Sequence, residues 1–144
     1  MSFDANKALS RRLYEEVFGR GHLTVADEIL SQDHVSHGSG TPPQVGTEGI
    51  KKQATLLRTA IPDLHVTLHD QLAEDDRVVS RWTGSGTHTG QLSLPSGVLP
   101  ATGARISFDE IRIDRFAHGQ IAESWFIPDR FTLWQQLGLI PTFP

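Results

Sequence analysis

Asp129 follows the last strand-like segment of the chain and directly precedes a short helical segment. A carboxylate at such a junction can cap the helix, since Asp is a preferred residue at helix N-caps. It can also serve in acid–base chemistry if the fold shields it from water. The pairing of the preceding hairpin bears on this choice. If His118-Gly119 forms a two-residue turn, Ala117 opposes Gln120 and Phe108 opposes Asp129.

This register would place ten side chains of the hairpin on one face. Aromatic rings, carboxylates and an arginine mix on that face, which is typical of the wall of a ligand pocket. A carboxylate beside Phe108 and near Trp125 is partly removed from water, and desolvation raises its proton affinity. The register therefore predicts Asp129 as a general base at neutral pH, although a slip of one residue would reverse every side chain. The ten residues are Phe108, Glu110, Arg112, Asp114, Phe116, Ile121, Glu123, Trp125, Ile127 and Asp129.

Arg112 and Trp125 would then face each other across the hairpin. Arg112 can form a cation–π contact with Trp125, or it can pair with Glu123 or Asp114. Asp114 opposite Glu123 is an unfavourable pair of like charges unless Arg112 lies between them. Trp125 itself fits a packed core as well as a ligand platform. These alternatives stay open from the sequence alone.

Several histidines are candidates for a binding site. His37 ends a short strand before a loop rich in Gly and Pro, which suits a surface position or a pocket rim. His88 follows glycines that indicate a bend or a close approach of the backbone. A zinc site needs three or four convergent ligands, and His65 and His69 share a strand face with no nearby acidic triad. We therefore expect no metal.

Composition narrows the class of protein. The 144 residues suit one domain, and we expect a single domain over residues 1–144. The net charge is -4 and the Lys and Arg residues are scattered, so we expect no nucleic-acid partner. The chain has no cysteine, which excludes disulfides and thiolate chemistry. The absence of a signal-peptide pattern and of any apolar run near ~18 residues predicts a cytoplasmic protein with no membrane partner.

The elements that must position these residues follow from periodicity. Apolar residues recur at helical spacing near residues 4–18, 24–30, 48–60 and 130–137. Strand-like alternation marks residues 33–37, 65–73, 77–88, 106–116 and 120–127. Loops rich in Gly and Pro fill residues 38–46 and 90–103. Helices followed by a curled antiparallel sheet predict an α+β domain.

Several blocks of this sequence, in this order, resemble the SnoaL-like polyketide cyclases. They are NKALSRRLYEEVFGRGHLTVADEIL, DHVSHG, RVVSRWTGSGTHTG, PATG and FAHGQIAESWFIPDRFTLWQQLG, which together reach from Asn6 to Gly138. The resemblance implies the cystatin-like, nuclear-transport-factor-two-like cone, in which a curved antiparallel sheet wraps around N-terminal helices. Ketosteroid isomerase and limonene epoxide hydrolase share this fold. The resemblance also implies a homodimer, with apolar area from the sheet face or the segment 138–144, burying about 1,000 Å² or more.

Family members of known activity close a polyketide ring by intramolecular aldol condensation without a cofactor. The resemblance assigns the base to Asp129. Tyr14 is placed like the helix tyrosine of ketosteroid isomerase, whose base position is similar to that of His37. The Arg-x-Asp of limonene epoxide hydrolase corresponds to Arg81-Trp82-Thr83, which lacks the second carboxylate and disfavours epoxide hydrolysis. The segment from Gln91 to Thr102 is longer than the family's usual turn.

The sequence thus leads to three hypotheses. The first is a cofactor-independent proton-transfer enzyme acting on a polyketide-like carbonyl compound, with Asp129 as catalytic base. The second is a binder of a hydrophobic small molecule without turnover, and the third is an epoxide hydrolase with an unusual acid pair. We expect the pocket to be lined or polarised by residues from the first helix and the sheet, namely Tyr14, His37, Arg81, His88, Phe108, Arg112 and Trp125.

Overall fold

The computed structural model describes residues 2–141 as four helices, one π-helical segment and eight strands. The helical segments are α1 (Phe3–Arg12), η1 (Leu13–Phe18), α2 (Thr24–Ile29), α3 (Glu48–Ala60) and α4 (Arg130–Gln136). The strands are β1 (Leu30–Gly38), β2 (Gln44–Val45), β3 (His65–Glu74), β4 (Arg77–Thr87), β5 (Leu92–Leu94), β6 (Gly97–Leu99), β7 (Arg105–Ala117) and β8 (Gln120–Pro128). The sequence predicted every element except the short strands β2, β5 and β6, which lie in segments expected to be loops.

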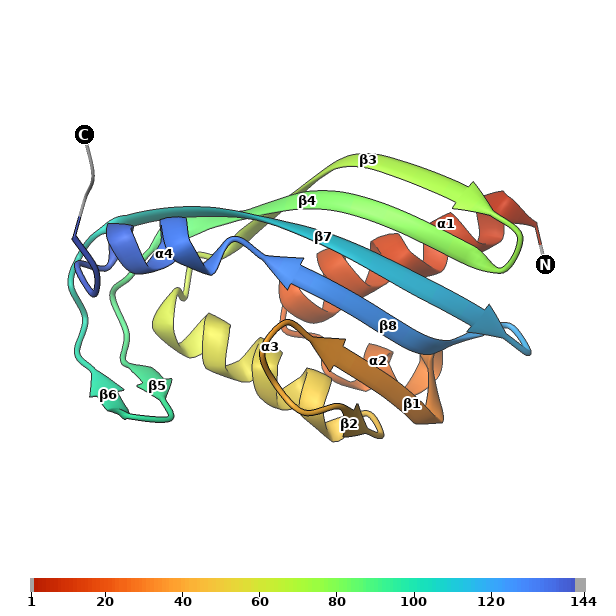
Figure 1. The fold of residues 1–144 in the computed structure, drawn as a ribbon, viewed down its shortest axis with the longest axis horizontal. Coiled ribbons are helices and arrows are strands. Elements are labelled where there is room, and N and C mark those ends of the chain that lie inside the picture. The colour runs from red at the N-terminus through yellow and green to blue at the C-terminus, as the bar shows by residue number, and fades with distance from the viewer. Residues whose placement is uncertain (1, 142–144) are drawn as a thin grey trace.

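A curved six-stranded sheet forms the body of the molecule, in the order β2-β1-β8-β7-β4-β3. Its pairs are antiparallel except for β1 and β8, which run parallel. Figure 1 shows α1, α2 and α3 gathered on one side of this sheet. The predicted α+β class, with a curved sheet wrapped around N-terminal helices, is confirmed. No helix within residues 2–141 is long and apolar enough to cross a membrane.

The η1 segment packs its apolar side against the sheet. Leu13 and Val17 of η1 are fully buried, as their spacing predicts. Tyr14 stacks on Trp82 of β4 with ring centroids 5.4 Å apart, and Trp82 meets Phe108 of β7 edge-on at 5.9 Å. Strand β4 alternates buried and more exposed residues, so one face of the sheet is turned to the helices and the other away.

The hairpin of β7 and β8 departs from the predicted register after its first two pairs. Ala117 opposes Gln120 and Phe116 opposes Ile121 as expected, but Arg115 then pairs with Glu123. The extra residue in β8 makes a β-bulge, and the pairing beyond it is shifted by one. The prediction that ten named residues share one face is therefore wrong.

The bulge removes the like-charge pair that the straight register would create. Asp114 faces the Ser124 hydroxyl, which donates to its Oδ1 at 2.6 Å. Arg115 faces Glu123, with Nη2 3.2 Å from Oε1. Opposite charges and a hydrogen bond replace two facing carboxylates, which favours the shifted pairing. As a result Arg112 and Trp125 lie on opposite faces of the sheet.

The segment between β4 and β7 is an ordered hairpin, β5–β6, and not a plain loop. Its base is tied to the end of α3, because the Gly90 amide donates to the Ala60 carbonyl at 3.1 Å. A Cβ at Gly90 would clash with the Thr59 carbonyl oxygen, so this close approach needs glycine. The hairpin is thereby held beside α3 at one end of the sheet (Figure 1).

Candidate active site

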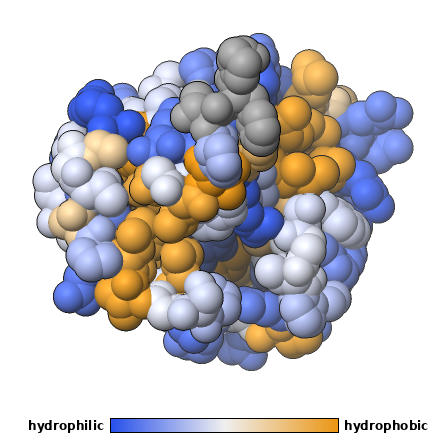
Figure 2. All heavy atoms as spheres, turned by 60° about the vertical axis from the view of Figure 1, so that its left-hand side comes forward, coloured by the Kyte–Doolittle hydropathy of each residue, from blue (hydrophilic) through white to orange (hydrophobic). Residues whose placement is uncertain are grey.

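A pocket opens at the end of the molecule where α3, α4 and the β5–β6 hairpin meet the inner face of the sheet (Figure 2). It leaves about 130 Å³ for the centres of water-sized molecules, where one water needs roughly 10–15 Å³. A small organic molecule can therefore enter. Most of its wall is apolar, formed by Leu56, Leu57, Ala60, Ile61, Leu92, Leu94, Ile106, Phe108, Pro128, Leu133 and Leu137.

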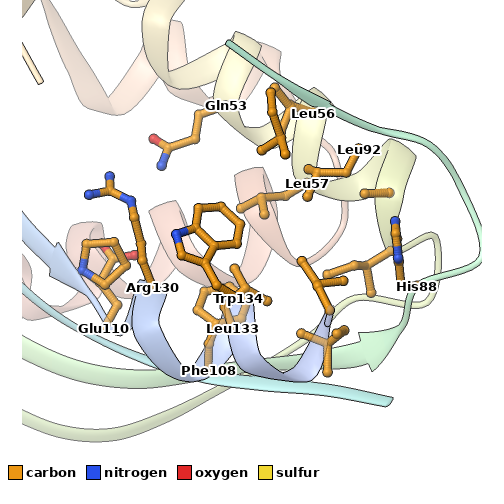
Figure 3. A pocket seen from close by; sticks show the side chains of 16 residues that line it. Gln53, Leu56, Leu57, His88, Leu92, Phe108, Glu110, Arg130, Leu133 and Trp134 are labelled. Atoms are coloured by element: carbon orange, nitrogen blue, oxygen red, sulfur yellow. The ribbon is translucent and has the colours of Figure 1, made fainter. Parts of the chain in front are cut away.

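The polar groups of the pocket divide between its two ends. Figure 3 shows Glu110, Arg130 and Gln53 near one end and His88 at the other, with Trp134 between them. Few polar groups in an apolar wall are the usual composition of a small-molecule site. The arrangement can hold an apolar body and contact oxygen or nitrogen atoms at its two ends.

Glu110 is the buried carboxylate of this pocket. It comes from the inner face of β7, and its side chain is 6% exposed. Burial raises its pKa from the ordinary 4.5 to about 7, against the opposing charge of Arg112. No hydrogen bond to this carboxyl group is found within residues 2–141, and the nearest Arg112 nitrogen is 3.8 Å from Oε1. A carboxyl group of this kind can both accept and donate a proton near neutral pH.

Behind Glu110 lies a buried polar network centred on Asp114. Its carboxylate accepts hydrogen bonds from Arg112 Nε at 3.1 Å, the Ser124 hydroxyl at 2.6 Å and the Ser10 hydroxyl at 2.8 Å. These three donors satisfy the hydrogen-bonding capacity of a carboxyl group that is fully buried. Asp114 in turn fixes the guanidinium of Arg112, whose charge acts on Glu110.

His34 completes the network as a neutral ring. Its Nε2 lies 2.9 Å from the Ser124 oxygen. Because the Ser124 proton is given to Asp114, His34 must donate this bond from Nε2. Burial lowers the pKa of His34 to about 4, so the ring is uncharged near neutral pH. His34 therefore adds no charge to the network.

Two predicted site residues, His88 and Phe108, line the pocket. Arg112 is buried on the inner face next to Glu110 but does not line the pocket. Its guanidinium lies 5.1 Å from the centre of the Phe126 ring. Tyr14 is fully buried in the core against Trp82 and is not part of the pocket wall.

Three other predicted site residues lie on the outer face of the sheet, away from the pocket, namely His37, Arg81 and Trp125. His37 donates from Nε2 to the Glu123 carboxylate at 2.7 Å and stacks on Trp125 with ring centroids 5.3 Å apart. The guanidinium of Arg77 lies over the Trp125 ring at 5.1 Å, whereas Arg112 takes the other predicted role and pairs with Asp114 at 3.1 Å. Arg81 is exposed and pairs with Asp70 at 2.6 Å. The strand alternation of β1, β4 and β8 turns these side chains outward.

Asp129 is exposed at the N-terminus of α4 and is not among the pocket residues. Its carboxylate accepts the Thr132 hydroxyl at 2.7 Å and the Thr132 amide at 3.0 Å. These hydrogen bonds hold the pKa of Asp129 below its ordinary value. The predicted desolvation and raised proton affinity are wrong, because the bulge places Asp129 opposite Asp109 and not Phe108. Its contacts are those of a helix cap, and its catalytic role stays a prediction.

The sequence did not identify Glu110, Gln53 and Arg130 as the residues that would supply polar groups to the pocket. Glu110 was placed on the pocket face but was not selected, because the wrong register gave Asp129 the desolvated position. The like charges of Asp114 and Glu123 were the available signal that the register slips. Arg130 and Gln53 carried no local signal, since only the fold brings α3 and α4 to the same pocket.

Within residues 2–141, no three His, Cys, Asp or Glu side chains converge as a group that could hold a metal ion. The pocket offers a buried carboxyl group whose pKa is raised to about 7, together with the cation of Arg130, the amide of Gln53 and apolar walls.

Comparisons with known proteins give the family and support the fold. The sequence model of a family described as SnoaL-like polyketide cyclase matches residues 8–137. A proposed polyketide cyclase from Bacillus cereus ATCC 10987 is 29% identical over 95% of this chain and 83% of its own, with a TM-score of 0.78. TsrD from Streptomyces laurentii is 25% identical over 97% of this chain and 99% of its own, with a TM-score of 0.83. IdmH, a proposed polyketide cyclase from Streptomyces antibioticus, is 27% identical over 92% of this chain and 98% of its own, with a TM-score of 0.78. No curated protein matches the chain.

Proposed function

Because the chain belongs to the SnoaL-like polyketide cyclase family, we propose that it is a cofactor-independent enzyme that moves a proton on a polyketide-like carbonyl compound, with Glu110 as the acid–base group. The observation that carries this proposal is a buried carboxyl group with a pKa of about 7 in an apolar pocket. A base whose pKa lies near the working pH is well matched to proton abstraction from carbon.

The reaction begins with transfer of a proton from the carbon beside a carbonyl group to the Glu110 carboxylate. The electron pair of the broken C–H bond moves to the carbonyl oxygen and forms an enolate. Arg130 places a positive charge near Glu110, and it borders the pocket together with Gln53. A cation and an amide at this end suit the developing oxyanion.

Ring closure follows when the enolate carbon attacks a second carbonyl group of the same molecule. A carbon–carbon bond forms and the attacked oxygen becomes an alkoxide. Glu110, now protonated, returns its proton to that alkoxide, so no net proton is gained or lost. Isomerisation is the simpler variant, in which the proton returns to another carbon. The apolar wall keeps water from competing for the enolate.

Asp129, the base that the resemblance implies, stands outside this mechanism. It is exposed, and its hydrogen bonds to Thr132 favour the ionised form and weaken it as a base. Epoxide hydrolysis gains no support either, since Arg81 and Thr83 pair with Asp70 and Asp109 on the outer face. The remaining alternative is a pocket that binds an apolar ligand without turnover.

The test replaces Glu110 by Gln, which keeps the shape and removes the titrating group. Exchange of the α-hydrogens of 2-tetralone with solvent deuterium, and cyclisation of polyketide-like diketones, are followed for the wild type and Glu110→Gln. We expect the variant to lose about 10²–10⁴-fold of the rate with little change in ligand affinity. Glu123→Gln, on the outer face, is the matched control and should retain the rate.

The outcomes separate the two remaining hypotheses. Binding of 2-tetralone without any exchange by the wild type supports a binder. Full activity in a folded Glu110→Gln protein contradicts the role proposed for this carboxyl group. Loss of activity in Asp129→Asn, with the same fold, would return the catalytic role to Asp129.

We also propose that the chain forms a homodimer through the outer face of the sheet. Ile111 and Ile127 are 51% and 68% exposed there, and they neighbour the half-buried Trp125. Part of the alternative contact, residues 142–144, lies outside the described residues. A stable interface needs about 1,000 Å² or more in total. Sedimentation at micromolar concentration should show a dimer that Ile127→Glu dissociates, and a monomer of the wild-type chain would contradict this.

A further inference from the structure

His88 stands at the end of the pocket remote from Glu110 and has an unused ring nitrogen (Figure 3). The residue is only 1% exposed. Its Nδ1 lies 2.9 Å from the Thr102 hydroxyl oxygen and 3.3 Å from the Thr102 amide nitrogen. Its Nε2 is buried and has no hydrogen-bond partner within residues 2–141. Buried polar groups are normally paired, so an unpaired one in a pocket wall points to a ligand atom.

The contacts of Nδ1 decide where the ring proton sits. A backbone amide can only donate, so Nδ1 must accept from the Thr102 N–H and cannot itself carry a hydrogen in this arrangement. The neutral imidazole then carries its hydrogen on Nε2. The unused atom is therefore a hydrogen-bond donor, and a matching ligand atom must be an acceptor.

The backbone holds this donor in place. The His88 amide donates to the Ala104 carbonyl at 2.9 Å, and the Gly103 amide donates to the His88 carbonyl at 2.9 Å. The Thr102 hydroxyl also accepts from the Ala104 amide at 3.2 Å. Thr102 is the last residue of the long segment from Gln91 to Thr102, which contains the β5–β6 hairpin. Leu92 of β5 lines the same pocket as His88. This segment thus supplies both part of the apolar wall and the group that fixes the His88 tautomer.

We propose that the Nε2–H of His88 donates a hydrogen bond to a second oxygen of the substrate, at the end opposite the reacting carbonyl group. This proposal rests on the proposed function, in which Glu110 and Arg130 handle the reacting end. The substrate class is then a fused-ring or otherwise flat apolar compound with oxygen functions at both ends, the distal one an acceptor such as a carbonyl or ether oxygen. His88 acts in recognition and takes no part in proton transfer.

Two probes of nearly equal shape test the donor. The compounds 6-methoxy-2-tetralone and 6-ethyl-2-tetralone share a ketone and differ by one oxygen at the distal end. Their dissociation constants are measured for the wild type and for His88→Phe, which keeps a ring but removes the donor. We expect the affinity ratio in favour of the methoxy compound to fall about threefold to tenfold in His88→Phe, the value of one neutral hydrogen bond. Binding of the ethyl compound shows that the variant's pocket is intact.

Nitrogen-15 shifts of the His88 ring give a second measurement that needs no ligand. They should show hydrogen on Nε2 and none on Nδ1 in the wild type at neutral pH. A proton on Nδ1, an unchanged affinity ratio, or failure of the methoxy compound to bind would overturn the proposal.

Glu110→Gln separates this proposal from the proposed function. If the function is right, that variant stops exchange at the ketone but keeps the methoxy preference. If only the function is wrong, the preference persists in a protein that never catalyses exchange, and the role of His88 in recognition stands.

Discussion

The two faces of the β7–β8 hairpin carry the same kinds of side chain and give them opposite properties. On the outer face, Glu123 contacts His37 at 2.7 Å and Arg115 at 3.2 Å, and these hydrogen bonds lower its pKa. On the inner face, Glu110 lies near Arg112 without a hydrogen bond, and burial raises its pKa to about 7. Residue type therefore does not identify the acid–base group of this protein. The acid–base group is identified by its solvent access and its hydrogen bonds. Both depend on the face of the sheet to which the side chain points, and the bulge determines that face for the residues of β8.

The comparison also separates two uses of buried charge. The carboxyl group of Asp114 accepts hydrogen bonds from Arg112 Nε and from two serine hydroxyls, whereas Nη2 of Arg112 has no hydrogen-bond partner among residues 2–141. Glu110 sits at the edge of this network and faces the pocket. A carboxyl group with three donors positions its surroundings, whereas a neighbouring carboxyl group without a hydrogen bond is available for chemistry.

The largest effect should come from breaking the inner network. Asp114→Ala leaves Arg112 buried without its anion, and we expect a loss of about 3–5 kcal/mol in the free energy of unfolding. Asp70→Ala removes the shorter but exposed pair with Arg81 on the outer face, 2.6 Å against 3.1 Å for Arg112 and Asp114, and should cost about 0–1 kcal/mol. Urea denaturation of both variants measures the contrast, and equal losses would erase the distinction between the faces.

A smaller effect should appear in the pH dependence of stability. The folded state holds the Glu110 proton up to about pH 7, whereas the ordinary pKa is 4.5. Between these values the unfolded chain binds fewer protons, so stability falls as pH rises, by roughly 3 kcal/mol for this group. Glu110→Gln should remove that loss and be the more stable protein at pH 8. A variant with the same slope as the wild type would contradict the raised pKa.

The smallest effect concerns Asp129, at the junction between the hairpin and α4. As a cap, Asp129→Ala should lower the free energy of unfolding by about 0.5–2 kcal/mol, while Asp129→Asn should change it little. Thermal unfolding of both variants, with the rate of exchange alongside, tests this. Equal stability of the three proteins would mean that the hydrogen bonds to Thr132 contribute nothing.

Much of the fold was predictable from the sequence because periodicity marks elements directly. Helix α3 was predicted at its observed bounds, and the long strands were found within a few residues. The short strands β2, β5 and β6 were missed because each is only two or three residues long and lies in a segment rich in Gly and Pro. The family resemblance supplied the cone that the elements alone did not specify.

The site was less predictable because one extra residue in β8 decides which side chains of that strand face the pocket. Alternation along β7 correctly joined Phe108, Glu110, Arg112 and Asp114 on one face. The bulge after Ile121 then turned the following side chains of β8 to the opposite face from the one predicted. Trp125 therefore lies on the outer face, and Asp129 is exposed. Cross-strand charge gave a hint of the slip, but its location depends on how the two strands pack against the helices.

The most direct test of this account is the titration of the Glu110 carboxyl carbon by carbon-13 NMR. Glu110→Gln assigns the resonance by its absence, and Glu123 on the outer face provides an internal comparison. We predict a midpoint near pH 7 for Glu110 and a midpoint below the ordinary 4.5 for Glu123. A Glu110 midpoint at or below 4.5 would show that the pocket does not hold its proton, and would contradict its role as the acid–base group.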